Sequence, residues 1–223
     1  MPSILNSLKE FAKGIVFRHT SLAAPTYRYN IEPIQLAYLV TEIERLKHQK
    51  ANVVEIGVAR GLTTRFLAQH IKNQKLDSQG VKLFAIDTFD SFTEQDLEFE
   101  VRNRGKALED LVAFNYNDFD VWKGNFTDFD FVVPVKADCS AVDYAKLGPI
   151  AVAFLDVDLY LPTKQTLPKL FDALVPGGVI LIDDVKNNNV YDGAYQAYME
   201  FCDQNSISPE IIGNKCGVIR KKA

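Results

Sequence analysis

The sequence predicts a doubly wound α/β fold, in which helices cover both faces of a mostly parallel sheet. Three observations favour this fold. Short apolar segments typical of buried parallel strands alternate along the 223-residue chain with segments whose apolar residues recur at helical spacing. A glycine-containing turn joins the first strand to its helix, and acidic residues follow the second to fifth strands. The carboxyl ends of parallel strands form the ligand-binding edge of such a sheet.

Length and composition indicate a single domain over residues 1–223. Hydrophobic residues make up 47% of the chain and charged residues 24%, as in soluble globular proteins. The formal net charge of −4 at pH 7 favours neither a nucleic-acid partner nor an anionic membrane, and no apolar run could span a bilayer. Cys139, Cys202 and Cys216 lack C-x-x-C spacing, so we expect reduced thiols in a cytoplasmic protein and no zinc site.

Residues 1–48 are expected to form two N-terminal helices. In the first helix, apolar residues recur at helical spacing, namely Ile4, Leu5, Leu8, Phe11, Ile15 and Val16. We expect this amphipathic helix to pack on its own domain or on a second subunit, as in a homodimer, rather than on a membrane. The second helix covers residues 31–48, with Pro33 suited to its first turn.

The first strand, residues 53–56, leads through Glu55-Ile56-Gly57-Val58-Ala59-Arg60-Gly61 into a helix over residues 62–75. A glycine turn of this kind lets a ligand approach the backbone and presents unpaired helix N–H groups to it. The spacing is E-x-G-x-x-x-G rather than the G-x-G-x-x-G of dinucleotide binders, which argues against NAD. Tight helix–strand packing is the alternative explanation for these glycines.

The second strand, residues 81–86, ends in Asp87, which is placed to accept hydrogen bonds from ribose hydroxyls. A turn or helix cap is the alternative role for Asp87. Residues 88–131 then form a long segment rich in aromatic residues, with a helix expected around residues 94–114 and Gly105 as its weak point. We expect this segment to be a cap-like insertion over the ligand site, although it can equally add a packing layer.

The third strand, residues 132–137, contains Pro134, which favours an edge position, and Asp138 follows it. The remaining elements are a fourth strand (150–155), a helix (164–174), a fifth strand (179–182), a helix (192–204) and an antiparallel hairpin (210–212 with 216–220).

Four aspartates follow the fourth and fifth strands: Asp156, Asp158, Asp183 and Asp184. Because these strands are joined by one helix, their ends should be neighbours, and the carboxylates should raise one another's pKa values. A hard divalent cation such as magnesium, calcium or manganese would relieve this repulsion. The alternative is that individual aspartates cap helices or pair with Lys164 or Lys186. Asp158 can point either at a metal or at a substrate hydroxyl.

Six motifs, E-I-G-V-A-R-G, I-D-T-F, A-D-C-S, F-L-D-V-D-L-Y-x-x-T, P-G-G-V-I-L-I-D-D-V and G-A-Y-Q-A-Y, resemble those of class I S-adenosylmethionine-dependent methyltransferases. The chain is most similar to the macrocin O-methyltransferase family of sugar-modifying enzymes over roughly residues 27–220. This resemblance implies a Rossmann-like sheet of seven strands with S-adenosyl-L-methionine and Mg2+ as cofactors. The short N-terminal part and residues 88–131 depart from the family pattern, which leaves the acceptor open.

The resemblance also implies roles for individual residues. Glu55, Gly57, Val58 and Gly61 correspond to the loop under the methionine part of the cofactor, Asp87 and Thr88 to the ribose contacts, and Asp138, Cys139 and Ser140 to the adenine-binding turn. Asp156, Asp183 and Asp184 correspond to the magnesium ligands, a set also similar to that of catechol O-methyltransferases. Asp158 corresponds to the proposed general base, and Asp156 is also assigned to cofactor binding and catalysis.

These observations lead to the hypothesis of a magnesium-dependent O-methyltransferase (EC 2.1.1) that acts on a vicinal-diol hydroxyl of a sugar or glycosylated natural product. A catechol or phenolic acceptor is the first alternative. A non-catalytic S-adenosylmethionine-binding module is the second.

Overall fold

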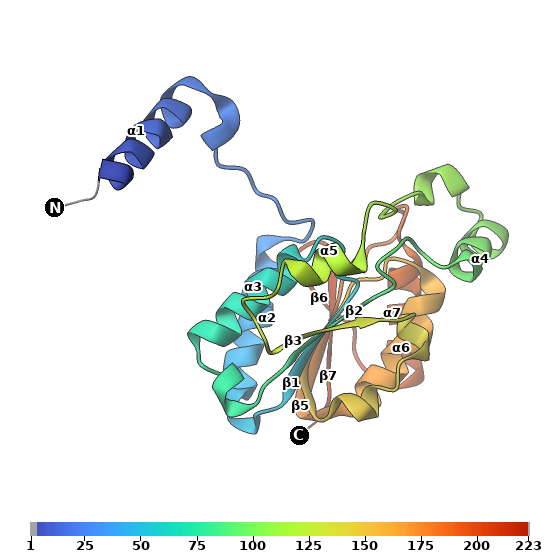
Figure 1. The fold of residues 1–223 in the computed structure, drawn as a ribbon. Helices are drawn as coiled ribbons and strands as arrows, with labels where there is room; N and C mark the ends of the chain where they lie inside the picture. Colours follow the sequence, from blue (N-terminus) through green and yellow to red (C-terminus); the bar gives the residue numbers. More distant parts are fainter. Residues whose placement is uncertain (1–3, 223) are drawn as a thin grey trace. The chain divides into compact units, whose positions relative to one another are not determined.

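The computed structural model describes residues 4–222. The chain divides into two compact units, residues 1–30 and residues 31–223. The first unit contains helix α1 (Ile4–His19) and a short 3-10 turn, η1 (Ser21–Ala23). The two N-terminal helices expected over residues 1–48 therefore lie in different units, because α2 (Pro33–Leu46) belongs to the second (Figure 1).

The second unit is built on a seven-stranded sheet with the strand order β3-β2-β1-β4-β5-β7-β6. The strands are β1 (Asn52–Ile56), β2 (Leu83–Asp87), β3 (Val132–Lys136), β4 (Ile150–Leu155), β5 (Leu174–Ile182), β6 (Glu210–Ile212) and β7 (Cys216–Arg220). The first five strands are parallel to one another, whereas β7 is antiparallel to both β5 and β6. This arrangement confirms the predicted doubly wound fold and its C-terminal hairpin.

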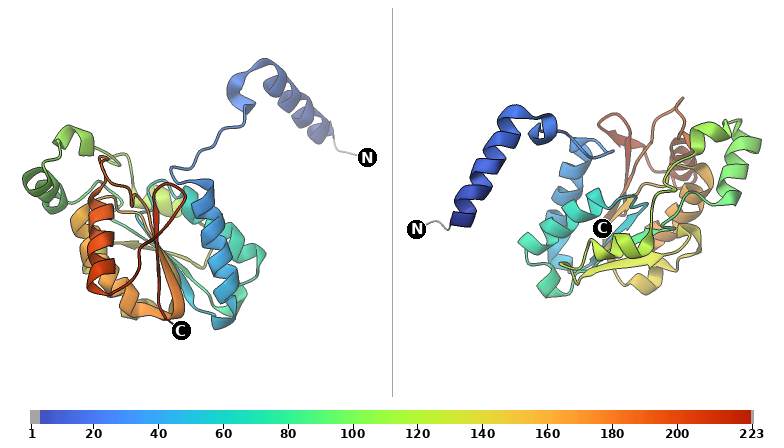
Figure 2. Two further views of the ribbon diagram at one scale, coloured as in Figure 1. Left: turned by 180° about the vertical axis from the view of Figure 1, so that it is seen from behind. Right: turned by 45° about the horizontal axis from the view of Figure 1, so that its top comes forward.

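Helices cover both faces of the sheet (Figure 2). The helices of this unit are α2, α3 (Leu62–Asn73), α4 (Glu94–Arg104), α5 (Phe119–Gly124), α6 (Tyr160–Ala173) and α7 (Gly193–Gln204). The helices α2 and α3 lie on one face, and α6 and α7 lie on the other. The strands between these layers are almost fully buried, since Val54 in β1, Ala153 in β4 and Ile180 in β5 have no exposed surface. None of the helices in residues 4–222 combines the length and apolarity needed to cross a membrane.

Strand register aligns the ends of the central strands. Ile56 pairs with Ile86 on one side and with Leu155 on the other, and Leu155 pairs with Ile182. The residues that follow these four leave the sheet at the same level, which places the acidic strand ends beside one another.

Most element boundaries agree with the sequence prediction, and the exceptions have local causes. The helix expected around residues 94–114 ends at Arg104, because Gly105 adopts a left-handed conformation (φ 68°) and caps it. Helix α6 begins at Tyr160 rather than near residue 164, and β5 already begins at Leu174. Pro134 does lie in an edge strand, β3.

Candidate active site

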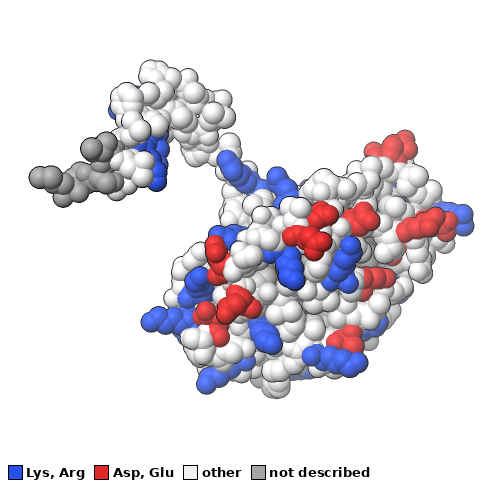
Figure 3. Space-filling view, viewed as in Figure 1, with Lys and Arg blue, Asp and Glu red and all other residues white. Residues whose placement is uncertain are grey.

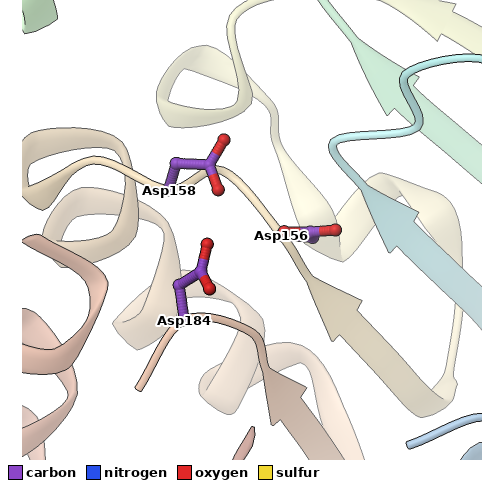
Figure 4. Close-up of side chains that lie close together, drawn as sticks. All are labelled: Asp156, Asp158 and Asp184. Carbon is purple, nitrogen blue, oxygen red and sulfur yellow. The ribbon is translucent and has the colours of Figure 1, made fainter. Parts of the chain in front are cut away.

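Three carboxylates surround one space at the ends of β4 and β5 (Figure 4). Asp156 and Asp158 follow β4, and Asp184 follows β5. One oxygen atom from each lies within 4.8 Å of the others. Asp158 and Asp184 both have left-handed backbones, with φ values of 62° and 55°. The strand ends therefore bring acidic side chains together as the sequence predicts.

Asp183 is not part of this group, although the sequence assigns it as a metal ligand. Its Oδ1 accepts a hydrogen bond from Gln35 Nε2 (2.8 Å), and its Oδ2 lies 2.9 Å from the Lys215 ammonium. Lys215 also contacts Asp184 Oδ1 at 2.8 Å. The alternative pairs with Lys164 and Lys186 are absent among the described residues, and Lys164 pairs with Glu200. Instead, a lysine from the β6–β7 turn pairs with Asp183 and bridges it to Asp184.

The electrostatics of the group follow from burial and mutual repulsion. Burial raises the pKa of Asp156 well above its usual value, and Asp183, Asp158 and Asp184 raise it further. The pKa of Asp158 is also well above its usual value, through burial and then through Asp184. Burial opposes the positive charge of Lys215, but the two neighbouring aspartates outweigh this effect and raise its pKa.

The group fits a hard divalent cation by its donor chemistry. All three side chains offer carboxylate oxygens, the ligands preferred by magnesium, calcium and manganese. Among the ion pairs of residues 4–222, only those of Lys215 reach these acids, and Asp156 and Asp158 have none. Lys215 supplies one positive charge beside four carboxylates, so the described side chains do not balance the negative charge here.

The carboxylate of Asp87 lies at the end of β2 and is saturated with hydrogen-bond donors. Oδ2 accepts from the N–H groups of Val58 (2.7 Å) and Ala59 (3.3 Å). Oδ1 accepts from the N–H of Phe89 (2.7 Å) and lies 3.3 Å from the Thr88 hydroxyl. Because a carboxylate has about four acceptor positions, all are in use. In this structure Asp87 acts as a cap for two turns, which is the alternative role that the sequence left open.

The two glycines of the β1–α3 loop are required by packing within the protein. Both have left-handed backbones, with φ near 80°. A Cβ on Gly57 would lie 1.8 Å from the carbonyl oxygen of Asp156, and a Cβ on Gly61 would lie 2.7 Å from the ring of Phe126. The tight-packing explanation therefore accounts for both residues, and their contact with a cofactor stays a prediction.

Glu55 lies behind this loop and is 1% exposed. Its Oε2 is buried without a hydrogen-bond partner among the described residues. Burial raises the pKa of Glu55 to about 8, and the nearby Asp87 adds to this effect. A carboxyl with this pKa carries a proton for part of the time at neutral pH.

The turn after β3 has the geometry of a small anchored loop. Asp138 Oδ1 accepts a hydrogen bond from Ser140 N (2.8 Å), and the carbonyl of Ser140 accepts one from Lys169. The Cys139 thiol is buried, which raises its pKa to about 12. Whether this turn contacts adenine stays a prediction.

Residues 88–131 contact the β1–α3 loop through α5 and the segment before it. Trp122 stacks on Phe126 with ring centroids 4.1 Å apart, and both rings lie against Gly61. Asn117 Nδ2 donates a hydrogen bond to the carbonyl of Ala59 (3.0 Å). This part of the segment thus packs on the β1–α3 loop.

Three residues near the acids were not identified from the sequence: Gln35, Tyr191 and Lys215. Burial raises the pKa of Tyr191, and the charges of the nearby Asp158 and Asp184 raise it further. Its ring centroid is 6.3 Å from that of Phe92, in residues 88–131. Gln35 and Lys215 reach the acids from α2 and from the hairpin turn, and no local motif marks them.

Comparisons with known proteins identify the family and the fold of the chain. The family model of the macrocin O-methyltransferases (TylF) matches residues 34–221. A comparison with curated proteins finds no match. The solved structure of the O-methyltransferase NovP is similar with a TM-score of 0.66 and 18% identity, covering 85% of this chain and 80% of NovP.

Two further solved structures have the same fold. The calicheamicin methyltransferase CalS11 gives a TM-score of 0.66 at 15% identity, covering 99% of this chain and 94% of CalS11. A putative caffeoyl-CoA O-methyltransferase from Staphylococcus aureus gives 0.52 at 14% identity, covering 99% and 93% of the two chains. The family match extends from α2 to the last strand. The chain therefore belongs to the macrocin O-methyltransferase (TylF) family, and it is an S-adenosylmethionine-dependent O-methyltransferase.

Proposed function

We propose that the protein methylates one hydroxyl of a vicinal diol on a sugar or sugar-containing small molecule, with the help of a divalent cation, Mg2+ in the first instance. The observation that supports this most directly is the group of Asp156, Asp158 and Asp184, with one oxygen of each within 4.8 Å. CalS11 is described as a TDP-rhamnose 3'-O-methyltransferase, which supports a sugar acceptor.

In this proposal the acids have separate roles. Asp156 and Asp184 hold the cation, which when bound lowers the pKa of the acceptor hydroxyl and fixes its oxygen. Asp158 accepts the proton of the acceptor hydroxyl. Its left-handed backbone directs its carboxylate toward those of Asp156 and Asp184. Asp183, the third predicted ligand, would have to give up Gln35 and Lys215 to reach the cation.

The cofactor would lie at the carboxyl ends of β1 and β2, beside these acids. Asp87 can accept ribose hydroxyls only if two of its present contacts lengthen. The contacts to Ala59 N and the Thr88 hydroxyl, both 3.3 Å, are the weakest and would yield first. Orienting the methyl donor against a fixed oxygen supplies most of the acceleration.

The test is a methyl-release assay with a sugar and a catechol, using TDP-rhamnose as the sugar and S-adenosylmethionine as donor. We expect turnover of TDP-rhamnose that is lost in EDTA and restored by Mg2+. Full activity in EDTA would contradict the role of the cation. Turnover of catechol alone would favour the phenolic alternative, which Phe92 and Tyr191 could support as flat contacts near the acids.

A binding module without catalysis is the remaining alternative. It predicts that calorimetry detects S-adenosylmethionine binding and that no methyl group is transferred to either acceptor. Four carboxylates at two strand ends are costly to keep in a protein that only binds the cofactor, because burial and repulsion raise the pKa values of Asp156, Asp158 and Asp183. We therefore favour the enzyme.

We also infer a homodimer formed through α1. This helix exposes large apolar side chains, including Leu8 (64% exposed) and Phe11 (68% exposed). Leu8→Asp with Phe11→Asp should convert a dimer to a monomer in sedimentation experiments, whereas a wild-type monomer would contradict the inference.

The mixed charges in Figure 3 and the buried free thiols support a small-molecule enzyme of the cytoplasm without a nucleic-acid partner.

A further inference from the structure

Asp158 has a backbone conformation that residues other than glycine rarely adopt, and contacts from helices α7 and α4 hold it in place. Its φ is 62°. Its carbonyl accepts a hydrogen bond from Ala194 N at the start of α7 (3.2 Å). Two residues later, Tyr160 N donates to Glu100 Oε1 of α4 (2.7 Å). The conformation of Asp158 therefore depends on contacts made by α7 and α4.

Glu100 is the buried residue of a helix whose other residues are exposed or half-buried. It is 1% exposed, whereas most of α4 faces solvent. Its second oxygen, Oε2, accepts from Arg104 Nε at 2.7 Å, and Arg104 reaches Asp192, just before α7, at 2.6 Å. A buried carboxylate is tolerated when its oxygens are paired in this way.

The carboxylate of Glu100 replaces a cap that α6 lacks. Leu159 occupies the N-cap position of α6 and has no side-chain acceptor. Glu100, which lies 60 residues earlier, supplies that acceptor and places negative charge at the helix N-terminus, where it is favourable. The space for it depends on Gly193, since a Cβ there would lie 2.7 Å from Glu100 Oε1 and 2.4 Å from Tyr160 N. Three helices thus meet around one carboxylate.

We propose that Glu100 is a positioning residue for Asp158. By accepting the hydrogen bond from Tyr160, it links the docking of α4, which belongs to residues 88–131, to the placement of the base. Glu100 has no role in the chemistry itself. Without it, the first N–H of α6 is left unpaired and Asp158 can leave its left-handed conformation. This inference rests on the role of Asp158 in the proposed function.

Three full-length variants test the link: Glu100→Ala, Glu100→Gln and, as the matched control, Glu98→Gln. Glu98 lies on the same helix but is exposed, and its partner is Arg102. We expect hydrogen–deuterium exchange in residues 157–162 to rise at least about five-fold in Glu100→Ala. The rise should be smaller in Glu100→Gln, whose amide oxygen can still accept from Tyr160, and absent in Glu98→Gln.

The activity measurement uses whichever of TDP-rhamnose and catechol the wild type methylates. Glu100→Ala should lower kcat at least about ten-fold with the KM for S-adenosylmethionine within about two-fold of wild type, and Glu100→Gln should recover part of the loss. Unchanged kcat, a KM that rises with the loss, or an equal loss in Glu98→Gln would overturn the proposal. Because a smaller folded fraction would also lower the apparent kcat at constant KM, kcat is calculated per S-adenosylmethionine-binding site counted by calorimetry.

Two further outcomes are decided by exchange alone. If the wild type methylates neither acceptor, the proposed function fails, but unchanged exchange in residues 157–162 of Glu100→Ala would separately overturn the link. If circular dichroism shows that Glu100→Ala does not fold, a fourth variant, Glu100→Asp, decides, because its shorter side chain withdraws the carboxylate from Tyr160 N. An exchange rate equal to wild type in that variant overturns the proposal.

Discussion

The two halves of the ligand edge handle their buried carboxylates in opposite ways. At the β1–β2 edge, formed by Glu55, Gly57 and Asp87, backbone N–H groups and a hydroxyl satisfy Asp87 completely. At the β4–β5 edge, formed by Asp156, Asp158, Asp183 and Asp184, the ammonium of Lys215 pairs with Asp183 and Asp184, and Asp156 and Asp158 have no ion pair among the described residues.

The difference determines which kind of ligand each half of the edge can bind. A carboxylate surrounded by amides is held in place, and it can exchange a weak contact for a neutral hydroxyl such as that of ribose. Carboxylates that face one another with one counter-charge are stabilised by a cation. Under the proposed function, the cofactor and the cation would therefore bind at different halves of this edge, and four predictions test the distinction.

The largest effect is expected where the two edges touch. Gly57→Ala places a Cβ 1.8 Å from the carbonyl oxygen of Asp156, so β1 and β4 must separate. We expect a loss of at least about 4 kcal/mol in unfolding free energy, or no folded protein. Gly80→Ala is the control, since Gly80 has a similar φ of 89° but nothing within 4 Å. Its denaturant midpoint should fall only slightly, and equal losses in both variants would show that strain at positive φ explains the effect.

Asp156→Asn should separate catalysis from cofactor binding. We expect kcat to fall by about 10³-fold or more while the Kd for S-adenosylmethionine, measured by calorimetry, changes less than about three-fold. Asp87→Asn is the matched variant at the other edge and should weaken the cofactor at least about ten-fold, because it loses acceptors for the loop amides. If Asp156→Asn weakened the cofactor as much as Asp87→Asn, the two edges would not have distinct roles.

Glu55→Gln should change how stability depends on pH. The pKa of Glu55 is raised from 4.5 to about 8 in the folded protein. Its contribution is therefore fully present below about pH 4.5 and is lost as the pH rises through 8. Urea unfolding measures the free energy of unfolding of the variant minus that of wild type. We expect this difference to rise by roughly 2 to 4 kcal/mol, in favour of the variant, between pH 4.5 and pH 8.5. A constant difference between pH 4.5 and 8.5 would show that Glu55 does not titrate in this range.

The smallest effect concerns Lys215. Because its ammonium occupies Asp183 and Asp184 at 2.9 and 2.8 Å, removing it should strengthen divalent-cation binding. Lys215→Met is expected to lower the Kd for Mn2+ about ten-fold, measured by electron paramagnetic resonance. Lys186→Met removes a nearby charge that forms no ion pair with these acids and should leave the Kd within about two-fold. Weaker Mn2+ binding in Lys215→Met would mean that the lysine orients Asp184 rather than competing with the cation.

The sequence by itself determined the strand and helix order, the edge position of Pro134, the antiparallel hairpin and the gathering of acids at the ends of β4 and β5. These features follow from periodicity, turn residues and the alignment of parallel strand ends, all of which are local or topological.

The tertiary structure decided which acids face one another. Asp158 joins the group and Asp183 leaves it because the side-chain directions depend on left-handed backbones at Asp158 and Asp184 and on Lys215, which arrives from a turn 31 residues after Asp184. The hydrogen bonds of Asp87 and the contact of Glu100 with the N-terminus of α6 at Tyr160 have the same origin. A hydrogen bond between distant segments has no period along the chain, so sequence pattern alone could not reveal it.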